Sequence, residues 1–180
     1  MQTHQLECHP AHPPLAVRSI EAKILSLTDN WLRVRWRIDG VSKLVVPPFA
    51  GKGRKDELWK TTCFELFLQK KGDAAYCEFN LSPSERWAAY DFTGYREGMS
   101  EREFRREPDC SMRMGQAMAI FDAALPRAQL PLPPLNAGLT AVIEEEGGVI
   151  SYWALAHGGE KPDFHDRTCF TATVGRTRAA

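Results

Sequence analysis

Two neighbouring stretches decide the fold of this chain, WKTTCFELFL at residues 59–68 and YCEFNLSP at residues 76–83. Side chains in a strand alternate between the two faces of a sheet, and both stretches show that alternation. Each has one apolar face, made of Phe64, Leu66 and Leu68 in the first stretch and Cys77, Phe79 and Leu81 in the second. The opposite faces carry Glu65, Glu78 and Asn80, which gather on one sheet face if the two strands pair. Such a face is either solvated or suited to a polar ligand with flat apolar sides, such as a sugar.

Strand patterns recur along nearly the whole chain. They predict further strands at residues 18–27, 32–38, 43–46, 86–92, 112–121, 139–145, 149–156 and 169–174. Turn residues such as Asp39-Gly40 and Gly147-Gly148 separate these apolar runs. A single short helix is expected at residues 100–106, where Ser100 and Glu103 fit a capping box. The predicted fold class is all-β: a two-sheet antiparallel β-sandwich of the immunoglobulin or jelly-roll kind, with one short helix at most.

The predicted core follows from the apolar side of each alternating run. We expect eight side chains to be buried, namely Leu32, Val34, Trp36, Phe64, Leu66, Leu68, Phe79 and Leu81. The predicted organisation is an N-terminal extension at residues 1–16, one domain at residues 17–175 and a C-terminal tail at residues 176–180.

Composition narrows the classes of partner. The chain has 180 residues, 43% of them hydrophobic, and 23 basic residues balance 23 acidic ones. This balance argues against a nucleic-acid partner, because nonspecific binding needs a basic surface. No apolar run is long enough to cross a membrane, and residues 1–14 lack the apolar region of a secretory signal. The five cysteines form no CxxC pair and are odd in number, which favours free thiols and a cytoplasmic location.

Four motifs together resemble a known family. They are ELWKTTCFELFL at residues 57–68, YCEFNLSP at 76–83, YWAL at 152–155 and KPDFH at 161–165. With these motifs the chain resembles a bacterial DOMON-like domain, a group that is similar to the family 9 carbohydrate-binding modules. The resemblance covers the chain from about the first predicted strand to Val174. It implies a two-sheet antiparallel sandwich, and binding of a sugar or of haem, as in other members of the wider superfamily.

The resemblance also implies a set of binding residues. In the sugar-binding modules two Trp rings clamp a terminal sugar, while a Glu and an Arg hold its hydroxyls. Trp59, Glu65 and Arg86 resemble the first Trp, the Glu and the Arg, and Trp153 is the candidate second ring. Glu78 and Asn80 join this ligand-binding set through their place on the same predicted face. The alternative is structural: Trp59 caps a sheet edge, Trp153 is core, and Glu65 and Arg86 form an ion pair.

Other chemistries stay open beside the leading hypothesis, a noncatalytic module that binds a saccharide or a similar small polar molecule and needs no cofactor. A haem-binding domain would need a Met, from Met99, Met112, Met114 and Met118, together with His157 or His165 as axial ligands. The same two histidines are weak candidates for a metal pair. Calcium is a further possible cofactor by resemblance, although no Asp/Asn/Gly loop suits it. Glu65 and Glu78 are the candidate carboxylate pair if the protein is an enzyme.

Overall fold

The computed structural model describes residues 2–175, and strands dominate it. One group of strands consists of β1 (Thr3–Cys8), β2 (Ser19–Leu27), β3 (Trp31–Asp39), β9 (Asp109–Met114) and β10 (Met118–Pro126). The other group consists of β4 (Gly53–Arg54), β5 (Cys63–Lys70), β6 (Tyr76–Leu81), β7 (Arg86–Phe92), β8 (Ser100–Glu101), β11 (Leu135–Glu145), β12 (Val149–Ala154) and β13 (Ala172–Val174). The all-β class predicted from the alternation is confirmed.

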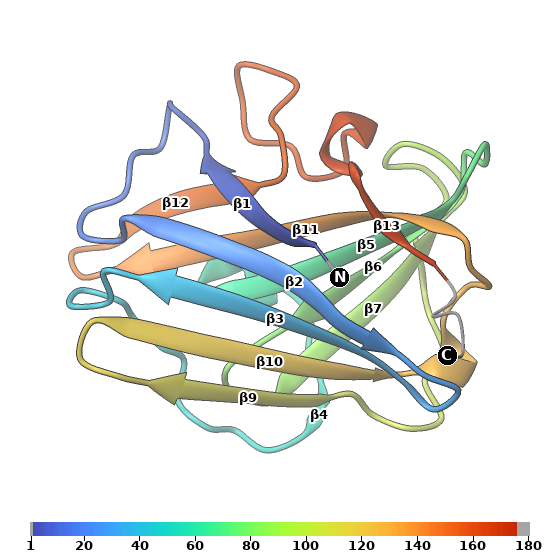
Figure 1. Cartoon of the computed structure of the whole chain (residues 1–180), viewed down its shortest axis with the longest axis horizontal. Helices are drawn as coiled ribbons and strands as arrows, with labels where there is room; N and C mark the ends of the chain where they lie inside the picture. Colours follow the sequence, from blue (N-terminus) through green and yellow to red (C-terminus); the bar gives the residue numbers. More distant parts are fainter. Residues whose placement is uncertain (1, 176–180) are drawn as a thin grey trace.

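These thirteen strands form one hydrogen-bonded sheet, in the order β4-β7-β6-β5-β11-β12-β1-β2-β3-β10-β9, with β13 beside β11 and β8 beside β7. Figure 1 shows the sheet curling so that β2, β3, β10 and β9 lie in front of β11, β5, β6 and β7. We call the first four strands the β2 half and the strands β4–β8 and β11–β13 the β5 half. The prediction of two separate sheets is therefore not confirmed, and the short pair β4–β7 is parallel rather than antiparallel.

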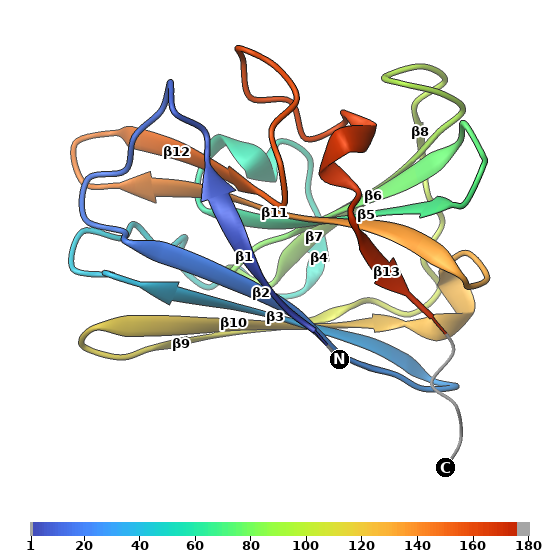
Figure 2. The same ribbon diagram turned by 45° about the horizontal axis from the view of Figure 1, so that its top comes forward.

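Strand β1 connects the two halves. Its first four residues pair with β2, from Thr3 opposite Lys23 to Leu6 opposite Ile20. Its last two residues pair with β12, where Glu7 lies opposite Ala154 (Figure 2). The predicted N-terminal extension at residues 1–16 is thus wrong for residues 3–8, which are integral to the sheet. The predicted tail at residues 176–180 lies outside the described residues.

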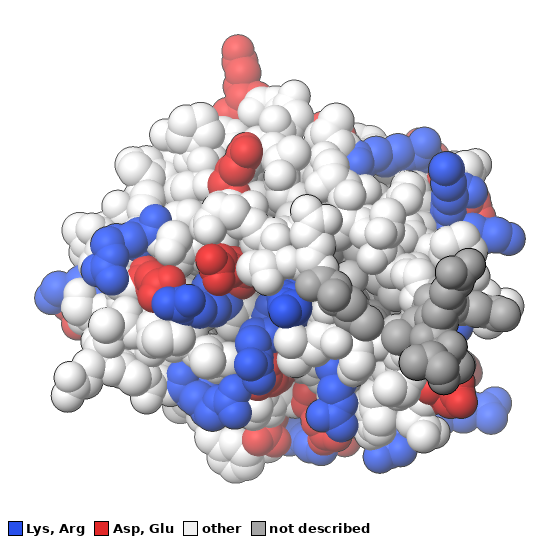
Figure 3. Space-filling view, in the orientation of Figure 1, with Lys and Arg blue, Asp and Glu red and all other residues white. Residues whose placement is uncertain are grey.

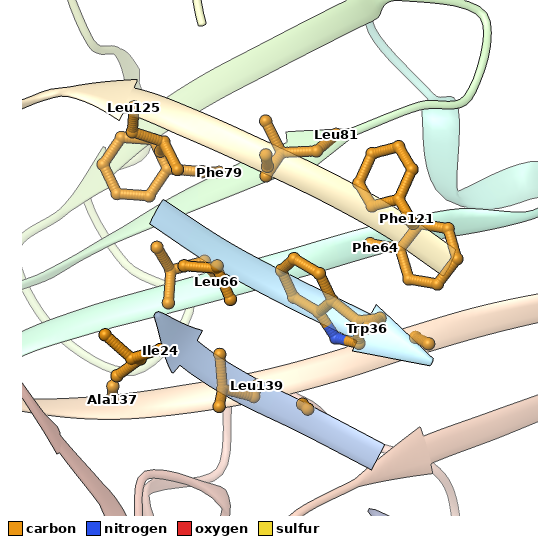
Figure 4. Packing of buried hydrophobic residues seen from close by; sticks show 14 of the residues in the cluster. Ile24, Trp36, Phe64, Leu66, Phe79, Leu81, Phe121, Leu125, Ala137 and Leu139 are labelled. Carbon is orange, nitrogen blue, oxygen red and sulfur yellow. The ribbon is translucent and has the colours of Figure 1, made fainter. Parts of the chain in front are cut away.

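The core fills the space between the two halves. All eight side chains that were predicted to be buried have an exposed fraction of 1% or less. Phe64 of β5 stacks on Phe121 of β10, with ring centroids 4.3 Å apart, and Trp36 of β3 lies 5.5 Å from Phe64 (Figure 4). Because these rings come from opposite halves, apolar packing across the core holds the curled sheet closed.

The predicted helix at residues 100–106 is wrong. Residues 100 and 101 form β8, and the segment then continues in an irregular path. The Arg102 guanidinium donates to Asp91 at 2.5 Å and to the Gln129 carbonyl at 2.9 Å, while the ring of Phe104 lies 5.1 Å from that of Trp87. These long-range contacts override a local capping signal in a short charged segment.

Helical structure in residues 2–175 consists of three 3-10 turns, η1 (Leu58–Lys60), η2 (Arg127–Gln129) and η3 (Arg167–Cys169). No helix in that range has the length and apolar character needed to span a membrane. All five cysteines are unpaired, as predicted, and four of them are buried. On the face seen in Figure 3, basic and acidic side chains are interspersed.

Candidate functional site

A row of polar side chains crosses the outer face of the β5 half. Register places Glu65 of β5 directly opposite Asn80 of β6 on one side and Thr140 of β11 on the other. Glu78 lies two residues from Asn80 on the same strand and therefore on the same face. The predicted gathering of Glu65, Glu78 and Asn80 on one face is confirmed.

This outer face is not solvated, because a second apolar cluster covers much of it. The segment between β12 and β13 rises over the β5 half (Figure 2) and contributes Phe164 and Phe170 to the cluster. Phe170 stacks on Phe67 of β5 at 5.4 Å between ring centroids. Both faces of β5 and β6 are consequently buried, and Glu65, Glu78 and Asn80 are 4%, 6% and 1% exposed.

A pocket of about 970 Å³ opens above the polar row. Strands β5, β6, β7, β11 and β12 supply its floor, and loops before β5, after β7 and after β12 supply its walls. Its lining residues are His12, Asp56, Glu57, Trp59, Glu65, Glu78, Asn80, Tyr90, Phe92, Arg96, Met99, Ser100, Glu101, Val142, Tyr152, Lys161, Pro162, Phe164 and His165. Of the six predicted ligand-binding residues, the pocket brings together Trp59, Glu65, Glu78 and Asn80.

Trp59 stands at the rim of the pocket on the η1 turn. Its neighbour Leu58 is buried and fixes the turn to the apolar cluster, whereas Trp59 is 48% exposed. A large apolar ring held in this way gains little from burial within the fold. Lys60 Nζ lies 5.9 Å from the centroid of the indole, and the half-exposed ring still offers apolar surface to a ligand in the pocket.

Hydrogen bonds on the floor leave one buried acceptor without a partner. The Asn80 side-chain nitrogen donates to Glu78 Oε1 at 2.9 Å, and the Thr140 hydroxyl donates to Glu65 Oε2 at 3.4 Å. The Asn80 side-chain oxygen is buried and has no hydrogen-bond partner within residues 2–175. Because an unpaired buried acceptor costs about 1–3 kcal/mol, this atom suits a hydrogen-bond donor on a bound ligand.

The two floor carboxyls both favour their neutral forms. Burial, together with the neighbouring Glu78 carboxyl, raises the pKa of Glu65 well above its ordinary value. Burial also raises the pKa of Glu78 to about 7, although its bond from Asn80 and the charge of Arg96 act in the opposite direction. Two adjacent acids in a low dielectric cannot both carry a full charge at little cost. The floor therefore holds a proton at neutral pH.

His165 borders the same carboxyls. Its Nε2 lies 3.6 Å from Glu78 Oε2, and its Nδ1 shares a 2.7 Å hydrogen bond with the Tyr76 hydroxyl. Burial and the nearby charge of Arg96 lower the pKa of His165 to about 4, so the ring is neutral at neutral pH. His165 entered the sequence analysis only as a haem or metal ligand, and its place beside Glu78 was not foreseen.

Arg96 is a wall residue that no sequence pattern identified. Its backbone adopts φ 55°, and its N–H donates to the Tyr76 hydroxyl at 3.2 Å. Its guanidinium donates to Asp163 at 2.7 Å, and the Tyr95 hydroxyl bonds the same carboxylate. This group fixes the loop after β7 against the segment after β12 and closes one side of the pocket.

Tyr90 and Tyr152 supply aromatic surface that was also not foreseen. Tyr90 lies opposite Glu78 in the β6–β7 register, and its hydroxyl donates to Asp56. Burial and that bond raise the pKa of Tyr90 above its ordinary value. Tyr152 precedes Trp153 on β12 and points to the other face of the sheet. Alternation along β7 and β12 is the sequence signal that could have assigned Tyr90 and Tyr152 to the pocket face.

Trp153 and Arg86 do not lie in the pocket. Trp153 is 4% exposed, belongs to the core between the two halves, and donates from Nε1 to Ser151 at 2.9 Å. Arg86 lies at the start of β7, and its guanidinium donates to the Ala50 carbonyl at 2.8 Å. The predicted clamp of two indoles is therefore absent. The alternative ion pair between Glu65 and Arg86 is absent as well from the described residues.

The histidines do not form the considered metal pair. His157 Nε2 bonds the Glu7 carbonyl at 2.9 Å and its ring lies 4.9 Å from that of His9, whereas His165 faces the pocket. Within residues 2–175, no three His, Cys, Asp or Glu side chains gather as a metal site.

Of the four candidate methionines and two histidines for haem, only Met99 and His165 line the pocket within the described residues. Met112, Met114 and Met118 belong to β9 and β10 in the β2 half. Met99 shares the pocket with His165. The Nδ1 of that ring is hydrogen-bonded to the Tyr76 hydroxyl at 2.7 Å, and its Nε2 lies 3.6 Å from Glu78 Oε2. Axial ligation through His165 would require breaking the Tyr76 bond or displacing the ring from Glu78.

The fold is similar to that of carbohydrate-binding modules. A protein from Bacteroides uniformis ATCC 8492, provisionally described as carbohydrate-binding, matches with a TM-score of 0.64 and 14% identity over 95% of this chain and 84% of that chain. A family 9 carbohydrate-binding module from Caldicellulosiruptor kristjanssonii in complex with glucose matches with a TM-score of 0.51 and 10% identity, over 98% of this chain and 87% of that one. A structure of such a module from the same organism with cellotriose matches equally well, over 97% and 85% of the two chains.

These matches confirm the predicted similarity to family 9 carbohydrate-binding modules at the level of the fold. No family model matches the chain, and no curated protein matches it. The DOMON-like part of the resemblance stays a prediction.

Proposed function

We propose that the protein binds a small saccharide in the pocket on the outer face of the β5 half. The observation that carries the proposal is the buried oxygen of Asn80, which has no partner among the described residues and lies beside two acids in a pocket that the half-exposed Trp59 also lines. Sugars combine hydroxyl donors at their edges with apolar C–H faces, and this pocket offers acceptors on its floor and an indole at its rim. The fold shared with carbohydrate-binding modules supports the same conclusion.

The aromatic contribution differs from the clamp that the sequence suggested. Trp59 is one platform, and Tyr152 takes the place proposed for Trp153 as the second aromatic surface. Glu65, Glu78 and Asn80 would hold ligand hydroxyls from below. A pocket of about 970 Å³ accommodates a mono- or oligosaccharide end rather than a flat polysaccharide surface. The expected cytoplasmic location, which remains a prediction, suits a soluble sugar of that size.

Isothermal titration with a panel of hexoses and disaccharides tests the proposal. We expect saturable binding by the wild-type protein and none detectable with Trp59→Ala. The matched control is Phe49→Ala, since Phe49 is 74% exposed and lies outside the pocket lining. Binding that survives Trp59→Ala, or that is lost equally in Phe49→Ala, would contradict the assignment of the site.

A second candidate function rests on the carboxyl pair. Glu65 and Glu78 line one pocket with raised pKa values, an arrangement that acid–base catalysis of glycoside hydrolysis also uses. Incubation with aryl glycosides distinguishes the two functions. Release of the phenol by the wild-type protein, lost in both Glu65→Gln and Glu78→Gln, would establish hydrolysis. Binding without release would leave the noncatalytic module.

A further inference from the structure

The floor of the pocket is richer in hydrogen-bond acceptors than a neutral sugar requires. Asn80 is 1% exposed, and its side-chain nitrogen donates a hydrogen bond to Glu78. Its side-chain oxygen has no partner among the described residues. Glu65 accepts one bond, from Thr140, on Oε2. Glu78 Oε2 lies 3.6 Å from His165 Nε2, which is too long for a hydrogen bond. The floor therefore offers the Asn80 oxygen, and those carboxyl oxygens of Glu65 and Glu78 that carry no proton, to donors on a ligand.

Charge around the pocket is also unbalanced. Its lining includes the acids Asp56, Glu57, Glu65, Glu78 and Glu101, against the bases Arg96 and Lys161. Arg96 is paired with Asp163 at 2.7 Å, and Lys161 is exposed at the rim. Two of the acids are also paired, Glu57 with Lys60 and Glu101 with Arg54. Among the described residues, neither Glu65 nor Glu78 has an ion pair with Arg or Lys. The floor thus lacks a cation of its own.

An ammonium group matches both features. It has three N–H donors and no acceptor, whereas each hydroxyl brings one donor together with lone pairs that need donors in return. Its binding would displace a proton from the carboxyl pair, and the carboxylate so formed would compensate the ammonium charge through charge-assisted hydrogen bonds.

We propose that the saccharide bound in this pocket is an amino sugar, with its ammonium group placed on the floor between Glu65, Glu78 and Asn80. This inference rests on the proposed saccharide-binding function and names the class of sugar. It differs from that function in its consequence, because a neutral sugar of the same shape should bind poorly.

The test is a titration with matched triplets of sugars. Each triplet contains a hexosamine, its N-acetyl form and the parent hexose, in the gluco, galacto and manno series, at about pH 6, well below the pKa of a simple amine. In at least one series we expect the hexosamine to bind about tenfold more tightly than both neutral partners, in line with the gain from charge-assisted bonds.

Proton release on binding is a second measurement. It should be seen if an ammonium group binds the carboxyls, and not if the protein selects the sugar by shape alone. The titratable or charged groups around Glu78 are Glu65, Tyr76, Tyr90, Arg96 and His165. An ammonium ion stabilises the ionised carboxyls, so its binding should release protons from the pair, and the measured enthalpy should vary with the ionisation enthalpy of the buffer. Binding of a neutral hexose should release none.

Two variants sharpen the result. Glu78→Gln should remove most of the preference for the hexosamine while retaining the shape of the pocket. Glu146→Gln removes the same charge at an exposed position paired with Lys43, outside the pocket, and should leave the preference unchanged. Thermal denaturation of both variants checks that they are folded.

The outcomes separate the two proposals. Neutral sugars that bind as tightly as their amino partners would overturn the amino-sugar inference and leave saccharide binding intact. Absence of binding by every sugar in the three series would overturn both. A preference for the hexosamine that persists in Glu78→Gln would overturn the placement of the ammonium on the floor.

Discussion

The inner and outer faces of β5 and β6 are both buried, but by different kinds of side chain. Phe64, Leu66 and Phe79 fill the inner face and meet rings from the opposite half of the sheet. On the outer face, apolar residues such as Phe67 alternate in space with Glu65 and Asn80 beneath a pocket. The inner face gains stability from complete apolar contact. The outer face keeps buried polar groups that are incompletely satisfied, which is typical of a binding site.

The largest effect that distinguishes the faces should come from the inner one. Phe64→Ala removes a ring that stacks on Phe121 at 4.3 Å, and it should lower the free energy of unfolding by about 3–5 kcal/mol. Urea denaturation measures this loss, with the exposed Phe49→Ala as control. A loss below about 1 kcal/mol would mean that the inner face is not the stabilising one.

The next prediction concerns the stability that the fold loses by burying an ionisable carboxyl, Glu78, on the outer face. Burial raises the pKa of Glu78 from 4.5 to about 7, so the folded state favours its protonated form. The stability contributed by that form is fully present below about pH 4.5 and is lost as the pH rises through 7. The side chain in Glu78→Gln stays neutral at every pH. The stability of this variant relative to wild type should therefore rise by on the order of 3 kcal/mol as the pH increases from about 4.5 to above about 7.

Denaturation curves of both proteins, recorded from about pH 4 to pH 8, measure that difference. The lowered pKa of His165 acts in the reverse sense, because its neutral form is favoured by folding, but His165 is present in both proteins and its contribution cancels to first order. Stability curves that stay parallel across the range would show that Glu78 titrates normally.

A smaller effect should separate two neighbouring residues of β12. Tyr152 borders the pocket, so Tyr152→Ala should weaken sugar binding by about 1–2 kcal/mol while the protein stays folded. Trp153→Phe, in the core, should lower stability without a specific loss of affinity. Titration and denaturation of both variants test this division, and the reverse pattern would exchange the roles of the two faces.

The smallest effect is expected at Arg86. Its guanidinium bonds the Ala50 carbonyl, outside the pocket, so Arg86→Lys should change the affinity for a sugar by less than about 0.5 kcal/mol. A substantial loss of affinity in a titration would restore Arg86 to the site.

Alternation within single strands made the core and half of the site predictable. The two faces of β5 and β6 follow from the sequence. A register slip of one residue would move every apolar side chain of a strand to the opposite face, so the apolar pattern selects the register. The prediction that Trp153 binds the ligand was wrong. The resemblance selected the larger ring, whereas its neighbour Tyr152 occupies the pocket-facing position on β12. The residues of β12 alone did not show which of its two faces packs against the core.

The parts that stayed unpredicted depend on contacts between distant segments. Arg96 and Asp163 meet from two loops, and neither loop carries a local signal for the other. At residues 100–106 a sound capping pattern gave way to the bonds of Arg102 and the packing of Phe104. The joining of the two halves into one sheet rests on six residues of β1, which sequence patterns did not distinguish from an extension.

The position of β1 has a consequence for how the molecule assembles. Glu7 pairs with Ala154, so the contact that joins the halves links opposite ends of the chain in sequence. Closing so long a loop is entropically costly, and contacts of this kind slow folding. During synthesis β1 is made before β2 to β11, whereas its partner β12 is made after them. The edge of β1 that pairs with β12 must therefore remain unpaired until β12 has been translated.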